Sequence, residues 1–134
     1  MSKLTIDKEC RELVRAMNLC RGVSTFYSCC GHGEKVFVIK FKVGTLSDLL
    51  PVVLASGGHL GNPVWACFVE NDTHKEKDIV FTLTSPSDVK GADAYDQASQ
   101  IAKNIYSLLS NDEIRTRLGL DWADRGKQLE LDFD

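Results

Sequence analysis

The clearest pattern in the chain is an alternation of apolar and polar residues over residues 35–43. Successive side chains of a β-strand point to opposite faces, so this segment predicts a strand with one buried face. Lys40 and Lys42 fall on the other face. Runs rich in β-branched and aromatic residues predict three further strands, at residues 23–29, 64–70 and 78–84. The buried face of the strand at residues 35–43 is predicted to carry Phe37, Ile39, Phe41 and Val43.

Apolar residues at helical spacing predict the remaining elements. A helix is expected over residues 7–20, where Asp7 can cap the start, and the longest helix over residues 93–109. Residues 46–55 predict another helix, in which Pro51 implies a kink or a late start. A capping box at Ser110-x-x-Glu113 predicts one more short helix, ended by Gly119.

The element order is therefore α-β-β-α-β-β-α. Two hairpins joined by a helix favour an α+β fold, a two-layer sandwich of a mainly antiparallel four-stranded sheet with helices on one face. The 134 residues fit a single domain. We expect this domain to span residues 1–120, with a C-terminal tail at residues 121–134.

Charge is distributed unevenly along the chain. The net charge is −3, but residues 1–50 carry eight Lys/Arg against five Asp/Glu, whereas residues 51–134 carry eight against fourteen. A small local positive excess permits an anionic ligand near the first third of the chain. It argues against a broad nucleic-acid surface, which depends on many neutralised phosphates. No apolar run is long enough to span a bilayer, so we expect no membrane contact and a cytoplasmic location.

The five cysteines form a poor disulfide framework, because their number is odd and two are adjacent. Cys10 and Cys20 fall in the apolar pattern of the first helix and are predicted to be small core residues. Reduced thiols are consistent with the expected cytoplasmic location.

The densest group of reactive side chains lies in a short loop between the first two strands. Glycines there allow positive φ and bring backbone N–H groups close to a ligand, and successive N–H groups can form a nest for an anion. A histidine beside them can carry a proton, contact an anion or bind a metal. The alternative is a tight hairpin with buried cysteines and an exposed histidine. The candidate ligand-binding residues are Tyr27, Ser28, Cys29, Cys30, Gly31, His32 and Gly33.

A second Gly-His pair, Gly58-His59, also precedes a predicted strand and is a faint echo of Gly31-His32. His59 is therefore a further candidate ligand-binding residue, although a helix C-cap followed by a turn is the simpler account of the loop. Cys29 or Cys30 with His32, His59 and Cys67 would make a tetrahedral zinc set. The spacing follows no common zinc pattern, so no metal site is expected. No catalytic residue is assigned from the sequence.

The segment Phe26-Tyr27-Ser28-Cys29-Cys30-Gly31-His32 resembles small uncharacterised proteins of bacterial and phage type that carry a YxSCCGHG-like segment. It is more distantly similar to the S-C-S-G-R segment of the wybutosine-synthesising tRNA methyltransferase family. Cys30 stands where that segment has serine, and His32 where it has arginine. The resemblance implies an α/β domain and S-adenosylmethionine-dependent methylation of RNA. S-adenosylmethionine is thus the cofactor that it suggests.

The C-terminus ends in the sequence QLELDF, which resembles the peptides with which bacterial proteins dock into the sliding clamp. The alternation also fits a terminal edge strand, or a strand that joins a neighbour's sheet and forms a homodimer. The predicted partner-binding residues are Gln128, Leu129, Leu131 and Phe133.

Three functions follow from these observations. The first is binding of a small molecule, anionic or of nucleotide type, at the Cys-Cys-Gly-His-Gly hairpin. The second is an S-adenosylmethionine-dependent methyltransferase-like activity on RNA. The third is an accessory role at the sliding clamp through the C-terminal peptide.

Overall fold

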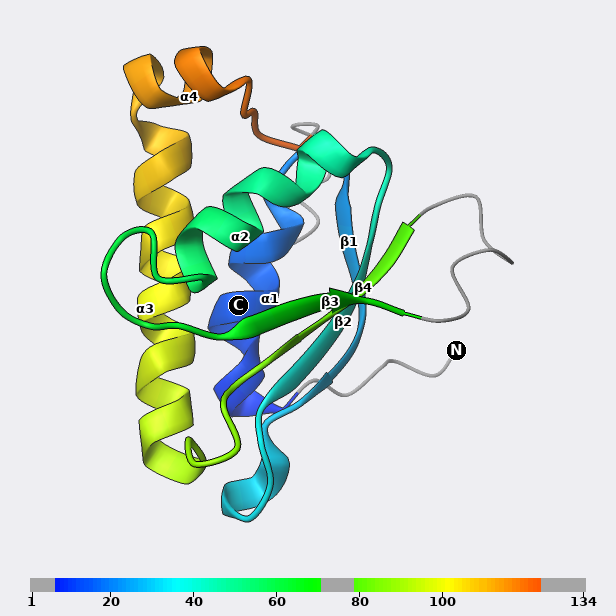
Figure 1. Cartoon of the computed structure of the whole chain (residues 1–134), viewed down its shortest axis with the longest axis vertical. Helices are drawn as coiled ribbons and strands as arrows, with labels where there is room; N and C mark the ends of the chain where they lie inside the picture. Colours follow the sequence, from blue (N-terminus) through cyan, green and yellow to red (C-terminus); the bar gives the residue numbers. More distant parts are fainter. Residues whose placement is uncertain (1–6, 71–78, 124–134) are drawn as a thin grey trace.

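A four-stranded antiparallel sheet forms one layer of the molecule, and helices form the other (Figure 1). The computed structural model describes residues 7–70 and 79–123. The strands lie in the order β1-β2-β4-β3. They are β1 (Val23–Cys29), β2 (Val38–Val43), β3 (Ala66–Val69) and β4 (Ile79–Thr84).

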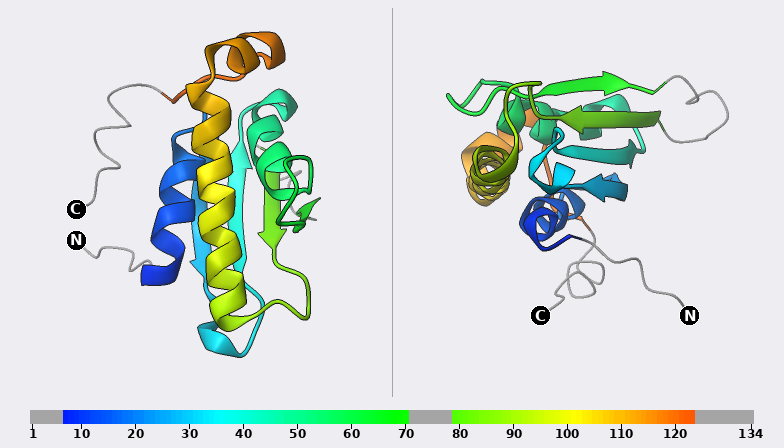
Figure 2. Two further views of the ribbon diagram at one scale, coloured as in Figure 1. Left: turned by 90° about the vertical axis from the view of Figure 1, so that its left-hand side faces the viewer. Right: turned by 90° about the horizontal axis from the view of Figure 1, so that it is seen from below.

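The main helices, α1 (Arg11–Asn18), α2 (Leu50–Ser56) and α3 (Gly91–Ser110), pack on one face of the sheet. Figure 2 shows α3 between α1 and α2, with the strands behind them. A short helix, α4 (Asp112–Leu118), follows α3. The predicted two-layer α+β fold with its antiparallel sheet is confirmed.

Strand β2 supplies the centre of the core, as its alternation predicts. Phe37, Ile39, Phe41 and Val43 are completely buried, whereas Lys40 and Lys42 are partly exposed on the opposite face. The strand begins later than expected, at Val38. Phe37 N–H donates to the Ser85 side chain (2.9 Å) and Phe37 C=O accepts from Ser85 N–H (3.0 Å), so one serine takes the place of a ladder partner.

The first helix differs from expectation at its start. A 3₁₀ turn, η1 (Lys8–Cys10), precedes α1, and the Asp7 side chain caps neither of them. Its carboxylate instead accepts a hydrogen bond from Cys30 N–H at 3.3 Å. The predicted capping role of Asp7 is therefore wrong, because a donor 23 residues away competes for the same oxygen.

The segment around Pro51 resolves the two alternatives left by the sequence. A 3₁₀ turn, η3 (Leu46–Leu49), comes first, and α2 then starts at Leu50 with Pro51 in its first turn. Proline fits there because its missing N–H would have no helical partner in any case. Thr45 and Asp48 form a capping box for η3, which the sequence analysis did not anticipate.

Helix α4 is capped one residue later than predicted. Ser110 is the last residue of α3, and the Asn111 side chain accepts from Ile114 N–H at 2.9 Å. Asparagine and serine are comparable N-caps, so the sequence alone did not separate them. Gly119 ends the helix in a left-handed conformation, as expected.

Residues 121–123, which we assigned to the tail, are hydrogen-bonded to the domain. Arg21 N–H donates to Asp121 C=O, and Ala123 N–H donates to Leu19 C=O at 2.7 Å. The predicted clamp-docking residues Gln128, Leu129, Leu131 and Phe133 lie outside the described residues, so that role stays a prediction. No helix in the described ranges is both long and apolar enough to cross a membrane.

Candidate functional site

The loop between β1 and β2 is a tight turn built on consecutive left-handed residues. Gly31, His32 and Gly33 form the 3₁₀ turn η2 (Gly31–Gly33) with φ of 81°, 53° and 84°. Glu34 N–H and Lys35 N–H both donate to Gly31 C=O at 3.0 Å. A Cβ on Gly31 would lie 2.8 Å from the Val36 carbonyl oxygen, so only glycine fits there.

Asp7, at the start of the described chain, brings a carboxylate into this turn. Its Oδ2 accepts from Cys30 N–H and lies 4.0 Å from His32 Nε2. Asp7 was not among the site residues predicted from the sequence, because no local pattern links it to a loop 23 residues away. An external anion would meet this carboxylate at the Cys30 amide, so the turn favours a cation there.

The two adjacent cysteines face different environments. Cys30 is buried, and its sulfur accepts from His32 N–H at 3.4 Å and lies 3.7 Å from His32 Nδ1. Burial raises the pKa of the Cys30 thiol, against the opposing effect of hydrogen bonds from His32 N–H and the Tyr95 hydroxyl. Cys29 is partly exposed. Of the two thiols, Cys29 is therefore the one open to a ligand.

Asp7, Cys29 and His32 form a cluster of potential metal ligands. One donor atom from each lies within 4.8 Å of the other two. Zinc ligands lie about 2.0–2.3 Å from the ion, so neighbouring donors in a tetrahedral site are roughly 3.5 Å apart. The three side chains would have to close by about 1 Å to hold such an ion. Asp7 and His32 are both accessible enough to move, with side chains 30% and 71% exposed.

The zinc set considered from the sequence is not assembled. Cys67 on β3 pairs with Leu83, which pairs with Ile39, which pairs with Ser28 on β1. Three strand spacings, about 14 Å, therefore separate Cys67 from the hairpin strand. Burial raises the pKa of the Cys67 thiol to about 11. The sulfur is thus predominantly protonated at neutral pH.

His59 lies in a separate loop after α2. Gly57 N–H closes the helix on Val53 C=O at 2.8 Å, and the His59 ring lies against Gly57. Asn104 of α3 donates to Ala55 C=O at 3.0 Å and so fixes the end of α2. This is the helix C-cap and turn that the sequence offered as the simpler account of the loop.

Tyr27 and Ser28 are placed on opposite sides of β1. The Ser28 hydroxyl is a hydrogen-bond partner of the Cys10 thiol, whose pKa burial raises to about 12. Tyr27 is half-exposed, with Lys40 Nζ 5.7 Å from its ring centroid. The candidate residues of the hairpin therefore do not converge on one point, and the reactive groups divide between the turn and the sheet surface.

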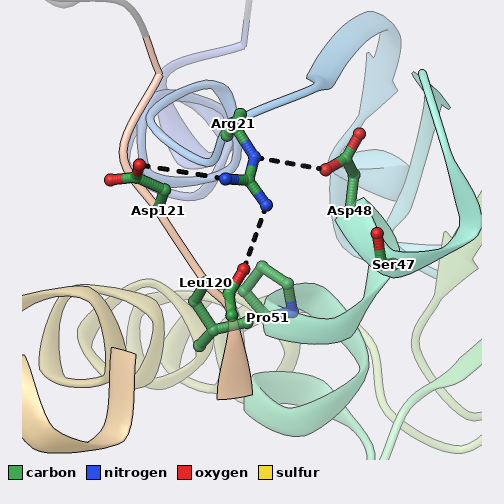
Figure 3. Close-up of a pocket in the computed structure, with 7 residues that line it drawn as sticks. Arg21, Ser47, Asp48, Pro51, Leu120 and Asp121 are labelled. Carbon is green, nitrogen blue, oxygen red and sulfur yellow. Dashed lines mark hydrogen bonds and ion pairs between the residues drawn. The ribbon is translucent and has the colours of Figure 1, made fainter. Parts of the chain in front are cut away.

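A small pocket at the opposite end of the sheet is lined by residues that Arg21 joins through ion pairs and a hydrogen bond. Figure 3 shows Arg21 reaching Asp48, Asp121 and the chain after α4. Arg21 Nε lies 3.6 Å from Asp48 Oδ1, Nη1 lies 3.8 Å from Asp121 Oδ2, and Nη2 donates to Gly119 C=O at 3.0 Å. The guanidinium is thus already paired on three sides, and we assign no ligand to this pocket.

Comparison with known proteins does not extend these observations: no family model, curated protein or solved structure matches the chain. The resemblance to the methyltransferase family, and the S-adenosylmethionine chemistry that it implies, therefore stay predictions.

Proposed function

We propose that the chain binds a divalent transition-metal ion through Asp7, Cys29 and His32, and that a small anionic ligand completes the ion's coordination. The supporting observation is that three different donors, from two distant segments, have ligand atoms within 4.8 Å of one another. Thiolate, imidazole and carboxylate are all ligands of zinc, and three protein ligands leave a fourth position open. The small-molecule function expected from the hairpin thus acquires a chemical basis.

The neighbours of these ligands favour metal binding. Cys30 N–H orients the Asp7 carboxylate, and Cys30 Sγ lies 3.7 Å from His32 Nδ1. When Nδ1 carries the proton, it can donate to this sulfur, and Nε2 keeps its lone pair for a metal. Partners of this kind fix the tautomer and the orientation of metal-binding histidines.

The start of α3 adds a reason for an anion at the open position. Gly91, the first residue of this 20-residue helix, lies against Gly33 of the turn, and its N-cap Lys90 makes no side-chain cap. The N-terminus of a helix carries partial positive charge and unpaired N–H groups. An anion bound to the ion would lie near this end of the helix.

Metal titration of the chain, purified without metal, tests the proposal. Co²⁺ takes the same nitrogen and sulfur ligands, and visible spectroscopy with Zn²⁺ competition gives both affinities. Loss of an outer-sphere partner costs about 10–100-fold in metal affinity, and loss of a direct ligand should cost at least as much. We therefore expect Cys29→Ser and His32→Ala each to weaken binding by about 100-fold or more.

The second cysteine and histidine of the earlier zinc set provide matched controls. Cys67→Ser and His59→Ala should leave the affinity unchanged, because neither residue is in the cluster. Equal affinity of Cys29→Ser and the parent chain would contradict the metal site. Addition of phosphate to the Co²⁺-loaded protein should change the visible spectrum. An unchanged spectrum at millimolar phosphate would contradict the proposed anionic ligand but not the proposed metal site.

A further inference from the structure

The face of the sheet opposite the helices presents a row of side chains that crosses all four strands. Tyr27 pairs with Lys40, Lys40 with Thr82, and Thr82 with Phe68. Ile39 and Phe41, the neighbours of Lys40 on β2, point into the core, so this row lies on the other side. In Figure 2 the helices of the described chain are all on the core side of the sheet.

Large aromatic side chains on this face are exposed to solvent. Tyr27 is 49% exposed and Phe68 is 50% exposed, at opposite ends of the row. Thr82 between them is only 5% exposed. Three strand spacings of about 4.8 Å place the two aromatic positions about 14 Å apart. The face is therefore a platform with an aromatic side chain toward each edge.

A β-bulge adds a third aromatic ring. The pairing of β1 with β2 shifts between Thr25 and Tyr27, so Phe26 is the extra residue. Strict alternation would bury one of two consecutive residues, but Phe26 and Tyr27 are both about half-exposed. Bulges commonly redirect a side chain at a functional surface.

Positive charge accompanies the rings. Lys40 Nζ lies 5.7 Å from the centroid of the Tyr27 ring, and Lys42 Nζ lies 5.7 Å from that of Phe26. Glu70 lies beside Lys40: its Oε1 is 3.7 Å from Lys40 Nζ and accepts from the Thr82 hydroxyl.

We propose that this platform binds single-stranded nucleic acid, with bases stacked on Tyr27 and Phe68 and backbone phosphates near Lys40 and Lys42. Sheet surfaces that carry aromatic side chains beside basic ones bind single strands in this way, because every base has a face that can stack. The two aromatic positions are about 14 Å apart, several times the ~3.4 Å rise per base of a duplex strand, so the two rings stack bases that are not stacked on each other. Tyrosine and phenylalanine are also enriched at protein interfaces, whereas lysine is depleted at their cores, so the two lysines are what favours nucleic acid over a protein partner.

Fluorescence anisotropy with labelled single-stranded RNA and DNA twelve-mers tests this site. The measurement is made with a chelator present, so that its outcome is independent of the metal site. Loss of one stacking ring costs about 1–3 kcal/mol per base, so Tyr27→Ala and Phe68→Ala should each weaken binding by about 5–150-fold. Tyr27→Phe keeps the ring and should bind like the parent chain.

The lysine contribution is read from the salt dependence. Each phosphate contact to a single strand contributes about −0.7 to the slope of log K against log salt. Lys42→Gln should therefore make the slope less steep by about 0.7. Lys103→Gln, on the exposed side of α3, is the matched control and should leave the slope unchanged.

Three binding results would overturn the proposal. The first is that the parent chain binds neither single strand at low salt. The second is that Tyr27→Ala and Phe68→Ala bind single strands as tightly as the parent chain does. The third is that duplex binds as tightly as single strands, or more tightly. Thermal unfolding of each variant identifies any loss of folding. If sedimentation shows a homodimer that the same two substitutions dissociate, the face is a protein interface and the proposal is wrong.

Discussion

The chain contains two Gly-His pairs, and their surroundings differ completely. Gly31-His32 lies where the end of β1 meets Asp7 and the start of α3. Gly58-His59 lies in a loop after the end of α2, and among the residues that the structure describes His59 has no hydrogen-bond or ion-pair partner. A glycine and a histidine are therefore not sufficient for a site. The first pair becomes a candidate site because a distant segment brings the Asp7 carboxylate to it, close to the neighbouring Cys29 thiol.

The same contrast extends to backbone strain. His32 is the only non-glycine residue with positive φ in the described ranges, at 53°. Residues in this conformation cost about 1–2 kcal/mol relative to their ordinary conformation. The hydrogen bond from His32 N–H to Cys30 Sγ is one interaction that opposes this cost. The second loop has positive φ only at glycines.

Alanine at the glycine of each pair should give the largest difference. Gly31→Ala places a Cβ 2.8 Å from a backbone oxygen, whereas the Cβ of Gly58→Ala lies 2.9 Å from the exposed Val64 side chain, which can rotate. Both substitutions also strain a residue with positive φ. We expect losses in the free energy of unfolding of about 2–4 kcal/mol for Gly31→Ala and about 1–2 kcal/mol for Gly58→Ala. Urea denaturation measures both, and equal losses would contradict the distinction.

Replacement of Asp7 tests whether the distant carboxylate makes the first loop different. Asp7→Asn retains an oxygen that can accept from Cys30 N–H but removes the negative charge. We expect metal affinity to fall by about 100-fold or more, as for the other two proposed ligands, with little change in stability. Isothermal titration calorimetry with Zn²⁺ measures this effect. Asp112→Asn, on exposed α4, is the matched control, and an equal loss there would show a general charge effect.

Thiol alkylation sharpens the comparison further. Cys29 is partly exposed, while burial raises the pKa of Cys10 and Cys20 to about 12 and so keeps both protonated. Cys29 should therefore react fastest in the native protein, and Zn²⁺ should slow its reaction severalfold. Mass spectrometry of the alkylated protein resolves the sites. Zinc protection of Cys67 rather than Cys29 would contradict the proposed metal site, because Cys67 lies on β3 at the other edge of the sheet.

The smallest expected effect is the pH response of a thiol that belongs to neither loop. Burial raises the pKa of Cys20 from 9.0 in its ordinary state to about 12 in the folded chain. Its contribution to stability is therefore complete below pH 9 and is lost as pH rises toward 12. The stability difference between the parent chain and Cys20→Ala should be constant from pH 6 to 8.5 and narrow above pH 9. Denaturation over this pH range measures it, and a difference that widens would contradict the direction.

Local patterns predicted most of the fold. Alternation at residues 35–43 placed Phe37, Ile39, Phe41 and Val43 in the core, and helical spacing predicted α3 to within two residues at its start and one at its end. Both signals depend on which side chains can share a buried face, which a short segment determines by itself. Element ends were less certain, as at Asn111 and Val38, because a cap or a ladder partner can be exchanged for a neighbour.

The candidate site could be predicted only in part. The sequence indicated the turn and its reactive residues, since two glycines, a histidine and two cysteines stand together. It placed Asp7 at a helix cap and included Cys67 and His59 among possible ligands. Which donors meet depends on the strand order β1-β2-β4-β3, which puts Cys67 at the far edge of the sheet from the hairpin.

The sequence by itself determined the elements, their order and the glycine turn, because these follow from the periodicity and backbone freedom of neighbouring residues. Tertiary structure decided that Asp7 joins Cys29 and His32, and that Tyr27, Lys40, Thr82 and Phe68 form one row. Both arrangements join residues that are far apart in the chain. Their proximity comes from the packing of α1 against β1 and from the pairing register of the strands, which no local pattern encodes.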